Sequence, residues 1–108
     1  MKKDSLHQMD IPFQGHYYML EDTGMYHCRN CKQELFRSEQ KFHSGSGWPS
    51  FDGAQTNALS IEEGGGRGRK VSCGQCGRFL GQMVKGEGFT EADMRFDINS
   101  SALIFKPD

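Results

Sequence analysis

Four cysteines constrain the fold of this chain more than any other feature. They form two C-x-x-C pairs, Cys28 with Cys31 and Cys73 with Cys76, and the 108 residues contain no other cysteine. Two such pairs with none left over are typical of a tetrahedral site made of four thiolates. Four thiolates leave no open coordination position, so the predicted cofactor is one structural Zn²⁺.

The spacing of the two pairs indicates what the metal holds together. Forty-one residues separate Cys31 from Cys73, so the metal would close a loop long enough to contain several strands. Loop closure costs little more as a loop lengthens, whereas zinc binding in small modules contributes roughly 10–16 kcal/mol. Only 35% of the residues are hydrophobic, so a chain of this length is expected to need such a staple.

Two disulfides or a redox-active pair are the alternative uses of four cysteines. Disulfides require an oxidising compartment, and the first residues include two lysines but no apolar run of signal-peptide length. A thioredoxin-like pair belongs to an alternating βαβ pattern, which this sequence does not show. Zinc is the preferred interpretation.

Charge and hydrophobicity argue against two classes of partner. The net charge is −1 with both signs interleaved, so we expect no nucleic-acid partner. No stretch approaches the roughly 18 apolar residues of a membrane span, so we expect no membrane partner. The expected location is cytoplasmic.

The pattern along the chain favours an all-β fold. Residues 1–10 are polar and mixed in charge, which predicts a flexible N-terminal tail, and residues 11–108 then form a single domain. Short apolar segments such as 79–84 are separated by turns roughly every eight to twelve residues, without a long helical period. Trp48 lies between Gly47 and Pro49, where it is either the wall of a ligand pocket or a core residue.

Several blocks of residues closely resemble the methionine-R-sulfoxide reductase B (SelR) family. The match runs in order over residues 12–105 and includes Phe13-Gln14-Gly15, Gly24 to Cys31, Ser44 to Phe51, Leu80-Gly81, Arg95-Phe96 and Ile98 to Leu103. The resemblance implies a β-tent fold of two antiparallel sheets, joined by a four-cysteine zinc site that is remote from the active site.

The same resemblance implies a chemistry that this chain lacks. In the family a cysteine or selenocysteine attacks the sulfoxide sulfur, and the resulting sulfenic acid is resolved by a second thiol. The nucleophile position is Asp97 here, and the two histidine positions of the family are Phe79 and Gln82. Ser46 stands where some members carry the resolving cysteine. A carboxylate cannot undergo the redox cycle of sulfur, so the predicted protein is a divergent member without reductase activity.

The resemblance also implies a recognition surface, because Trp48, Arg95 and Asn99 match the substrate-binding positions of the family. Alternatively, Arg95 pairs with Asp97 or Asp93, and Asn99 makes a turn hydrogen bond. Burial would raise the pKa of Asp97 and a nearby arginine would lower it. Its carboxylate would suit an amine ligand or act as a general base.

Three functions follow from these features. The first is a zinc-stabilised SelR-fold protein that binds oxidised methionine, free or in a peptide, or a similar small group. The second is an active peptide-methionine (R)-S-oxide reductase working by an altered mechanism. The third is a zinc-stabilised protein-interaction module with a protein partner.

Overall fold

The computed structural model describes residues 9–62, 68–86, 88 and 90–108. Within these ranges the regular elements are short strands and single turns of 3₁₀ helix at Ser38–Gln40 and Ser100–Ala102. The strands are β1 (Gly24–Cys28), β2 (Glu34–Arg37), β3 (Lys41–Phe42), β4 (Ser50–Phe51), β5 (Leu59–Glu62), β6 (Arg69–Cys73), β7 (Phe79–Lys85), β8 (Met94–Ile98) and β9 (Leu103–Pro107).

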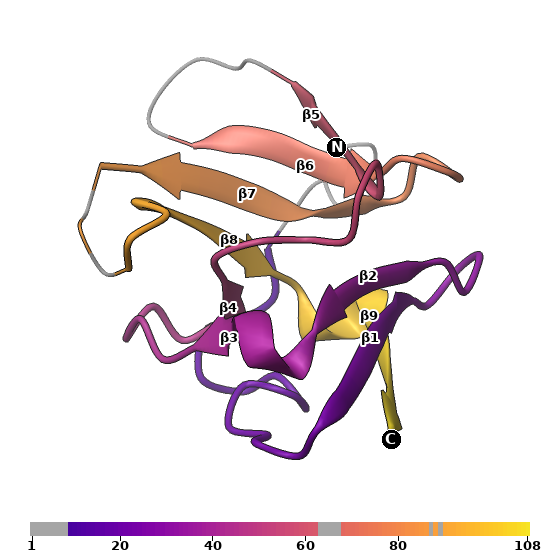
Figure 1. Ribbon diagram of the computed structural model, residues 1–108, viewed down its shortest axis with the longest axis horizontal. Coiled ribbons are helices and arrows are strands. Elements are labelled where there is room, and N and C mark those ends of the chain that lie inside the picture. The colour runs from indigo at the N-terminus through magenta and orange to yellow at the C-terminus, as the bar shows by residue number, and fades with distance from the viewer. Residues whose placement is uncertain (1–8, 63–67, 87, 89) are drawn as a thin grey trace.

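The strands form two sheets in which every pairing is antiparallel. The smaller sheet has the order β2-β1-β9, and the larger has the order β3-β4-β8-β7-β6-β5. In Figure 1 the smaller sheet lies below the larger one, and β3 and β4 lie on the side that faces it. The predicted all-β fold with two antiparallel sheets is confirmed, and the strand expected at 79–84 is β7.

Aromatic side chains fill the space between the sheets. Phe36 of β2 stacks on Phe51 of β4 with ring centroids 4.2 Å apart. Tyr26 of β1 meets Phe51 edge to face at 5.1 Å. All three side chains are fully buried, so this contact fixes the smaller sheet against the start of the larger one.

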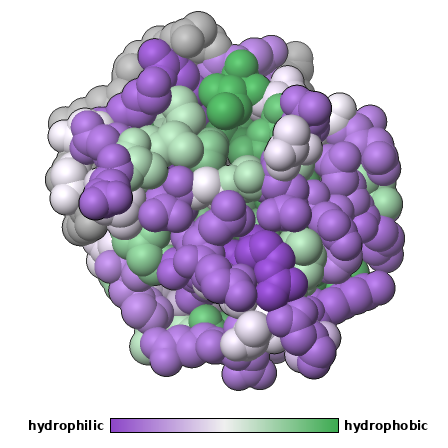
Figure 2. Space-filling model, viewed as in Figure 1, coloured by the Kyte–Doolittle hydropathy of each residue, from purple (hydrophilic) through white to green (hydrophobic). Residues whose placement is uncertain are grey.

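The surface of the domain is mostly polar. Figure 2 shows hydrophilic residues over most of the face in view, with hydrophobic atoms gathered near its upper edge. Strand β5 lies at that edge of the larger sheet, where Ile61 is 43% exposed. Within the described ranges, no helix has the length and apolar character needed to cross a bilayer.

The chain ahead of β1 lies against the loop that carries Trp48. Phe13 donates its backbone N–H to the carbonyl oxygen of Gly47 at 2.7 Å. Gly47 has φ of +93°, and a Cβ at this position would lie 2.6 Å from the Pro12 side chain. A glycine is therefore required by both the backbone conformation and the close approach of Pro12.

The predicted tail over residues 1–10 falls mainly outside the described residues, which begin at Met9. Asp10 is fixed to the domain, because its carboxylate accepts hydrogen bonds from Ser101 N at 3.0 Å and Ser101 Oγ at 2.7 Å.

Candidate functional site

The four cysteines form one cluster between the sheets. Cys28 ends β1 of the smaller sheet and Cys73 ends β6 of the larger, and each strand is followed by the second cysteine of its pair. All four Sγ atoms lie within 4.8 Å of one another, with Cys28 to Cys76 at 3.7 Å and Cys31 to Cys73 at 3.6 Å. All four thiols are free.

Both cysteine turns adopt the same backbone conformation. The carbonyl oxygen of Cys28 accepts a hydrogen bond from Lys32 N at 2.8 Å, and that of Cys73 accepts one from Gly77 N at 2.9 Å. Lys32 and Gly77 both have positive φ, of 69° and 82°. The two knuckles therefore present their thiols from matching turns, as a symmetric metal site requires.

The geometry and the donor atoms fit a tetrahedral metal. A tetrahedral zinc with Zn–S distances of about 2.3 Å has neighbouring sulfurs about 3.8 Å apart, whereas a disulfide bond is about 2.05 Å long. The Cys31 to Cys73 and Cys28 to Cys76 separations of 3.6 and 3.7 Å match the first value. The cluster can therefore hold a metal ion, and none of the four cysteines forms a disulfide.

Proton affinities differ across the cluster. Burial raises the pKa of Cys28 to about 12 and also raises the pKa of Cys73. A hydrogen bond from the Asn30 side chain is the main reason that the pKa of Cys76 falls to about 6. The buried thiols would have to release protons on binding a metal, so the cluster needs a cation to become fully ionised.

Asp97 lies at the centre of the second site. Its position in β8 is opposite Ser50 of β4 on one side and Gln82 of β7 on the other. The Oδ1 atom accepts hydrogen bonds from Ser50 Oγ at 2.9 Å and Ser46 Oγ at 3.3 Å. The Oδ2 atom accepts from Gln82 Nε2 at 3.4 Å and Arg95 Nε at 3.1 Å. Four donors from four places in the sequence thus converge on one carboxylate.

This carboxylate is closed off from solvent. The Asp97 side chain is fully buried, and its ion-pair partner Arg95 is only 14% exposed. Strands β7 and β8 also approach closely here, because a Cβ on Gly81 would collide with the backbone carbonyl of Asp97. An ionised carboxylate only accepts hydrogen bonds, and here its acceptors are used by the protein itself.

The predicted recognition residues lie around the same strand but have partners of their own. Trp48, which is half-buried, donates its Nε1–H to the backbone carbonyl of Asp10 at 2.7 Å. The Asn99 side chain is buried and accepts the backbone N–H of Asp10 through Oδ1 at 2.7 Å. Phe79 lies on β7 three residues before Gln82 and is half-buried.

Asp10 is the residue of this site that sequence reasoning missed. It meets Trp48 and Asn99 through main-chain atoms, which leave no signature in the sequence. The acidic side chain next to the family-like Phe13-Gln14-Gly15 block is the one signal that could have suggested an anchored position. Its contacts with Ser101 connect this segment to the residues that follow β8.

A two-sheet all-β domain with a four-cysteine cluster is the class of protein that the fold and the site define. The family model described as the SelR domain matches residues 5–107. The chain therefore belongs to the SelR domain family, which is the methionine sulfoxide reductase B family expected from its motifs.

Relatives with known names agree with this assignment. Peptide methionine sulfoxide reductase B9 of Arabidopsis thaliana is 45% identical over 93 residues, covering 84% of this chain and 65% of that protein. The chloroplastic reductase B2 of the same plant is 40% identical and is covered for 50% of its length. The reductase MsrB of Thioalkalivibrio sulfidiphilus is 41% identical over 88% of this chain and 72% of that protein.

The chain thus spans about two thirds of the first of these relatives and half of the second. Among solved structures, the Mis18 'Yippee-like' domain superposes with a TM-score of 0.64 at 17% identity. The superposition covers 80% of this chain and 97% of that domain. At this identity the likeness concerns the fold alone.

Proposed function

We propose that this chain is a zinc-stabilised SelR domain that binds oxidised methionine and does not reduce it. The observation that carries the proposal is the environment of Asp97, which the resemblance implies to be the position of the family's nucleophile. A buried carboxylate held by Ser46, Ser50, Gln82 and Arg95 has no sulfur to oxidise. The four thiols of the chain all lie in the cysteine cluster.

Zinc is the metal that we assign to the cluster. Four sulfur donors in a closed tetrahedral arrangement suit Zn²⁺, and such sites stabilise folds rather than activate water. The cluster joins β1 to β6, so the bound metal would tie the two sheets together within the single domain proposed for residues 11–108. The chemistry that the metal would supply is thus structural.

The ligand is proposed from the relatives and from the residues around β8. The relatives are named peptide methionine sulfoxide reductases. The resemblance of the motifs implies that Trp48, Arg95 and Asn99 take the family's recognition positions. Trp48 offers an aromatic face to a thioether or methyl group. Arg95 is occupied with Asp97, so in this proposal it supports the site rather than contacting the ligand directly.

The decisive experiment measures binding and turnover in the same sample. The zinc-loaded protein is titrated into a fluorescently labelled methionine-R-sulfoxide peptide and into the labelled unoxidised peptide, and binding is followed by fluorescence anisotropy of the label. Reduction is then assayed with dithiothreitol. We expect preferential binding of the oxidised peptide, no reduction, and loss of binding in Trp48→Ala. Turnover that depends on Trp48 would instead favour an active reductase with an altered mechanism. Absence of both would favour an interaction module.

A graft tests whether the missing chemistry alone separates this chain from its relatives. The variant Asp97→Cys, Phe79→His, Gln82→His restores the thiol and both imidazoles, so we expect measurable R-sulfoxide reduction with dithiothreitol. The control is the same triple variant with Ser in place of Cys at position 97. A folded, zinc-loaded graft that neither binds nor reduces the sulfoxide would contradict a retained recognition surface.

A further inference from the structure

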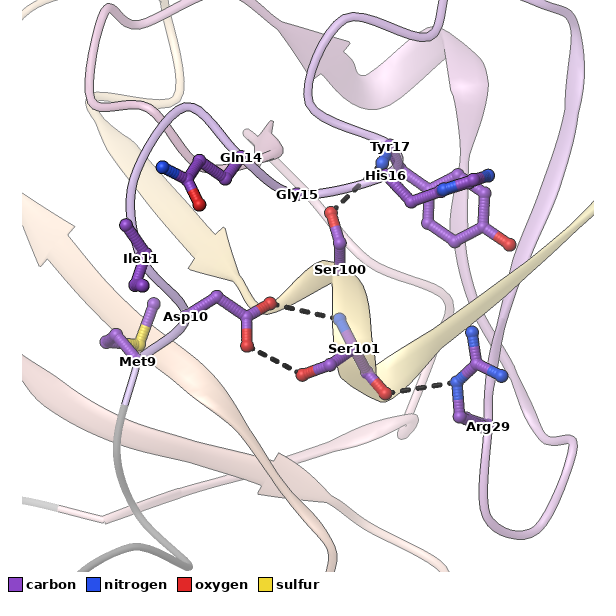
Figure 3. Close-up of a pocket in the computed structure, with 10 residues that line it drawn as sticks. All are labelled: Met9, Asp10, Ile11, Gln14, Gly15, His16, Tyr17, Arg29, Ser100 and Ser101. Atoms are coloured by element: carbon purple, nitrogen blue, oxygen red, sulfur yellow. Dashed lines mark hydrogen bonds between the residues drawn. The ribbon is translucent and has the colours of Figure 1, made fainter.

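A pocket of about 640 Å³ is lined in part by Asp10, whose main chain also contacts Trp48 and Asn99. Figure 3 shows its arrangement: Met9 and Ile11 lie at one end, His16 and Arg29 lie at the other, and the Asp10 to Ser101 contacts lie between them. One end is thus apolar and the other carries hydrogen-bond donors. The pocket is not part of the Asp97 site.

The guanidinium of Arg29 is oriented by a hydrogen bond that uses only one of its donors. Its Nε donates to the carbonyl oxygen of Ser101 at 3.0 Å, and its backbone N–H donates to the carbonyl of Ala102 at 2.9 Å. Its terminal Nη groups make no hydrogen bond to any residue that the structure describes. A planar fork of N–H donors fixed in this way is suited to a carboxylate.

His16 adds a second donor at the same end. Its ring packs edge to face on Tyr17 with centroids 5.4 Å apart, which orients the imidazole. Within the described ranges, the imidazole nitrogens have no hydrogen-bond partner. Arg29 and His16 can therefore both contribute donors to one ligand group.

The local charge balance supports an anionic group despite the presence of Asp10. Both carboxylate oxygens of Asp10 are already bonded to Ser101. Arg78 donates Nη2 to the Ser101 carbonyl at 3.4 Å, and Lys32 donates Nζ to the Arg29 carbonyl at 2.8 Å. Arg78 and Lys32 thus contact the main chain of Ser101 and Arg29 beside the pocket, whereas the carboxylate of Asp10 in the pocket lining already has two donors.

We propose that this pocket is a subsite that receives an acidic side chain of the bound peptide, with its carboxylate on Arg29 and His16 and a neighbouring apolar side chain against Met9 and Ile11. The inference rests on the proposed function for its location, because the Asp10 backbone links the pocket to Trp48 and Asn99. It names the substrate class as peptides in which an Asp or Glu lies near the oxidised methionine.

Four peptides of one length separate this inference from the proposed function. Two contain methionine-R-sulfoxide and two contain methionine. Within each pair, one peptide has Asp and the other has Asn next to the methionine or its sulfoxide. Dissociation constants are measured by fluorescence anisotropy at low ionic strength. We expect the Asp sulfoxide peptide to bind about fivefold more tightly than the Asn one, as for a partly exposed charged pair.

The preference for Asp should fall to about onefold in Arg29→Gln and weaken in His16→Gln, while it persists in Lys85→Gln. Lys85 is the last residue of β7 and does not line the pocket. Its substitution by Gln therefore removes the same unit of charge as Arg29→Gln, but outside the pocket. Metal content and thermal melting of each variant confirm that the cluster next to Arg29 is intact.

Each outcome decides one of the two proposals. Sulfoxide-dependent binding without a preference for Asp overturns the subsite and leaves the proposed function standing. A preference for Asp that depends on Arg29 but not on oxidation supports the subsite and overturns the proposed function. Absence of binding by all four peptides overturns both.

Discussion

The cysteine cluster and the Asp97 site balance their charges in opposite ways. The thiols of the cluster are drawn from two sheets, and burial holds the pKa of Cys28 and Cys73 above the ordinary range. Asp97 instead has its counter-ion within the chain, because Arg95 lies 3.0 Å from its Oδ1 atom. The cluster is built to receive a cation from outside, whereas the aspartate is already satisfied. The comparison shows which of the two sites is open to an inorganic ligand.

Removing a thiol should have the largest effect, because the cluster depends on a bound metal. We expect Cys28→Ser or Cys76→Ser to release zinc and abolish cooperative unfolding, since zinc binding in such sites contributes roughly 10–16 kcal/mol. Metal content by mass spectrometry and circular dichroism melts measure the result. The matched control is Gln75→Ala, which alters an exposed residue of the same turn and keeps all four thiols. A native melt in the serine variants would contradict a structural metal site.

Breaking the internal ion pair should have the next largest effect. Arg95→Ala leaves the buried Asp97 carboxylate without its counter-ion, which should destabilise the fold by about 3–5 kcal/mol in urea denaturation. The double variant Arg95→Met, Asp97→Leu removes both charges and should recover part of the loss. If Arg95→Ala unfolds at the same urea concentration as the unmodified protein, Arg95 does not stabilise the buried Asp97 carboxylate as inferred here.

A smaller loss is expected where the N-terminal segment meets the domain. Asp10→Ala removes both hydrogen bonds to Ser101 but keeps the backbone contacts to Trp48 and Asn99. The expected cost is about 1–2 kcal/mol, together with a change in Trp48 emission. Asp10→Asn retains one acceptor and should be intermediate. Equal stability of all three proteins would show that this segment is not anchored by its side chain.

The smallest effect is expected at the surface ion pairs, which sharpen the contrast with Asp97. Arg37 Nη2 lies 2.8 Å from Asp108 Oδ2, and its hydrogen bonds hold the pKa of Asp108 and Glu39 below their ordinary values. A carboxyl group whose pKa is lowered by folding stabilises the folded state at pH values above its ordinary pKa. That contribution is lost as the pH falls through the lowered pKa. Arg37→Gln should therefore shift the urea midpoint slightly at pH 7 and not at all near pH 2. A larger shift of the urea midpoint at pH 2 than at pH 7 would contradict stabilisation by these ion pairs.

The sequence predicted the scaffold better than the contacts of the site. The two C-x-x-C pairs placed the cluster, and the short apolar segments separated by turns predicted the all-β class, because both signals are local in the chain. The partners of Asp97 come from residues as far away as Ser46 and Ser50, so they depend on the register of β4, β7 and β8. Register is set by the folded sheet and is not visible in spacing alone.

Trp48 and Asn99 show the same limit in another form. The resemblance to the family placed both on a recognition surface, and the alternative for Asn99 was a local hydrogen bond. The structure shows both bonded to the main chain of Asp10, which lies 38 residues before Trp48 and 89 residues before Asn99. Every residue has the same main-chain atoms, so a contact to the main chain does not depend on residue type. No pattern in the sequence could therefore have identified this contact.

The position of β9 also has a consequence for the order in which the protein is assembled during its synthesis. Strand β1 carries Cys28 and is the middle strand of its sheet, but its neighbour β9 comprises Leu103–Pro107 at the end of the chain. At roughly 5–20 residues per second, the ribosome adds the last cysteine a few seconds before it completes β9. All four ligands are thus made before their sheet can close. The two knuckles include no residue of β9, so binding of a metal and closure of the smaller sheet can be separate steps of assembly.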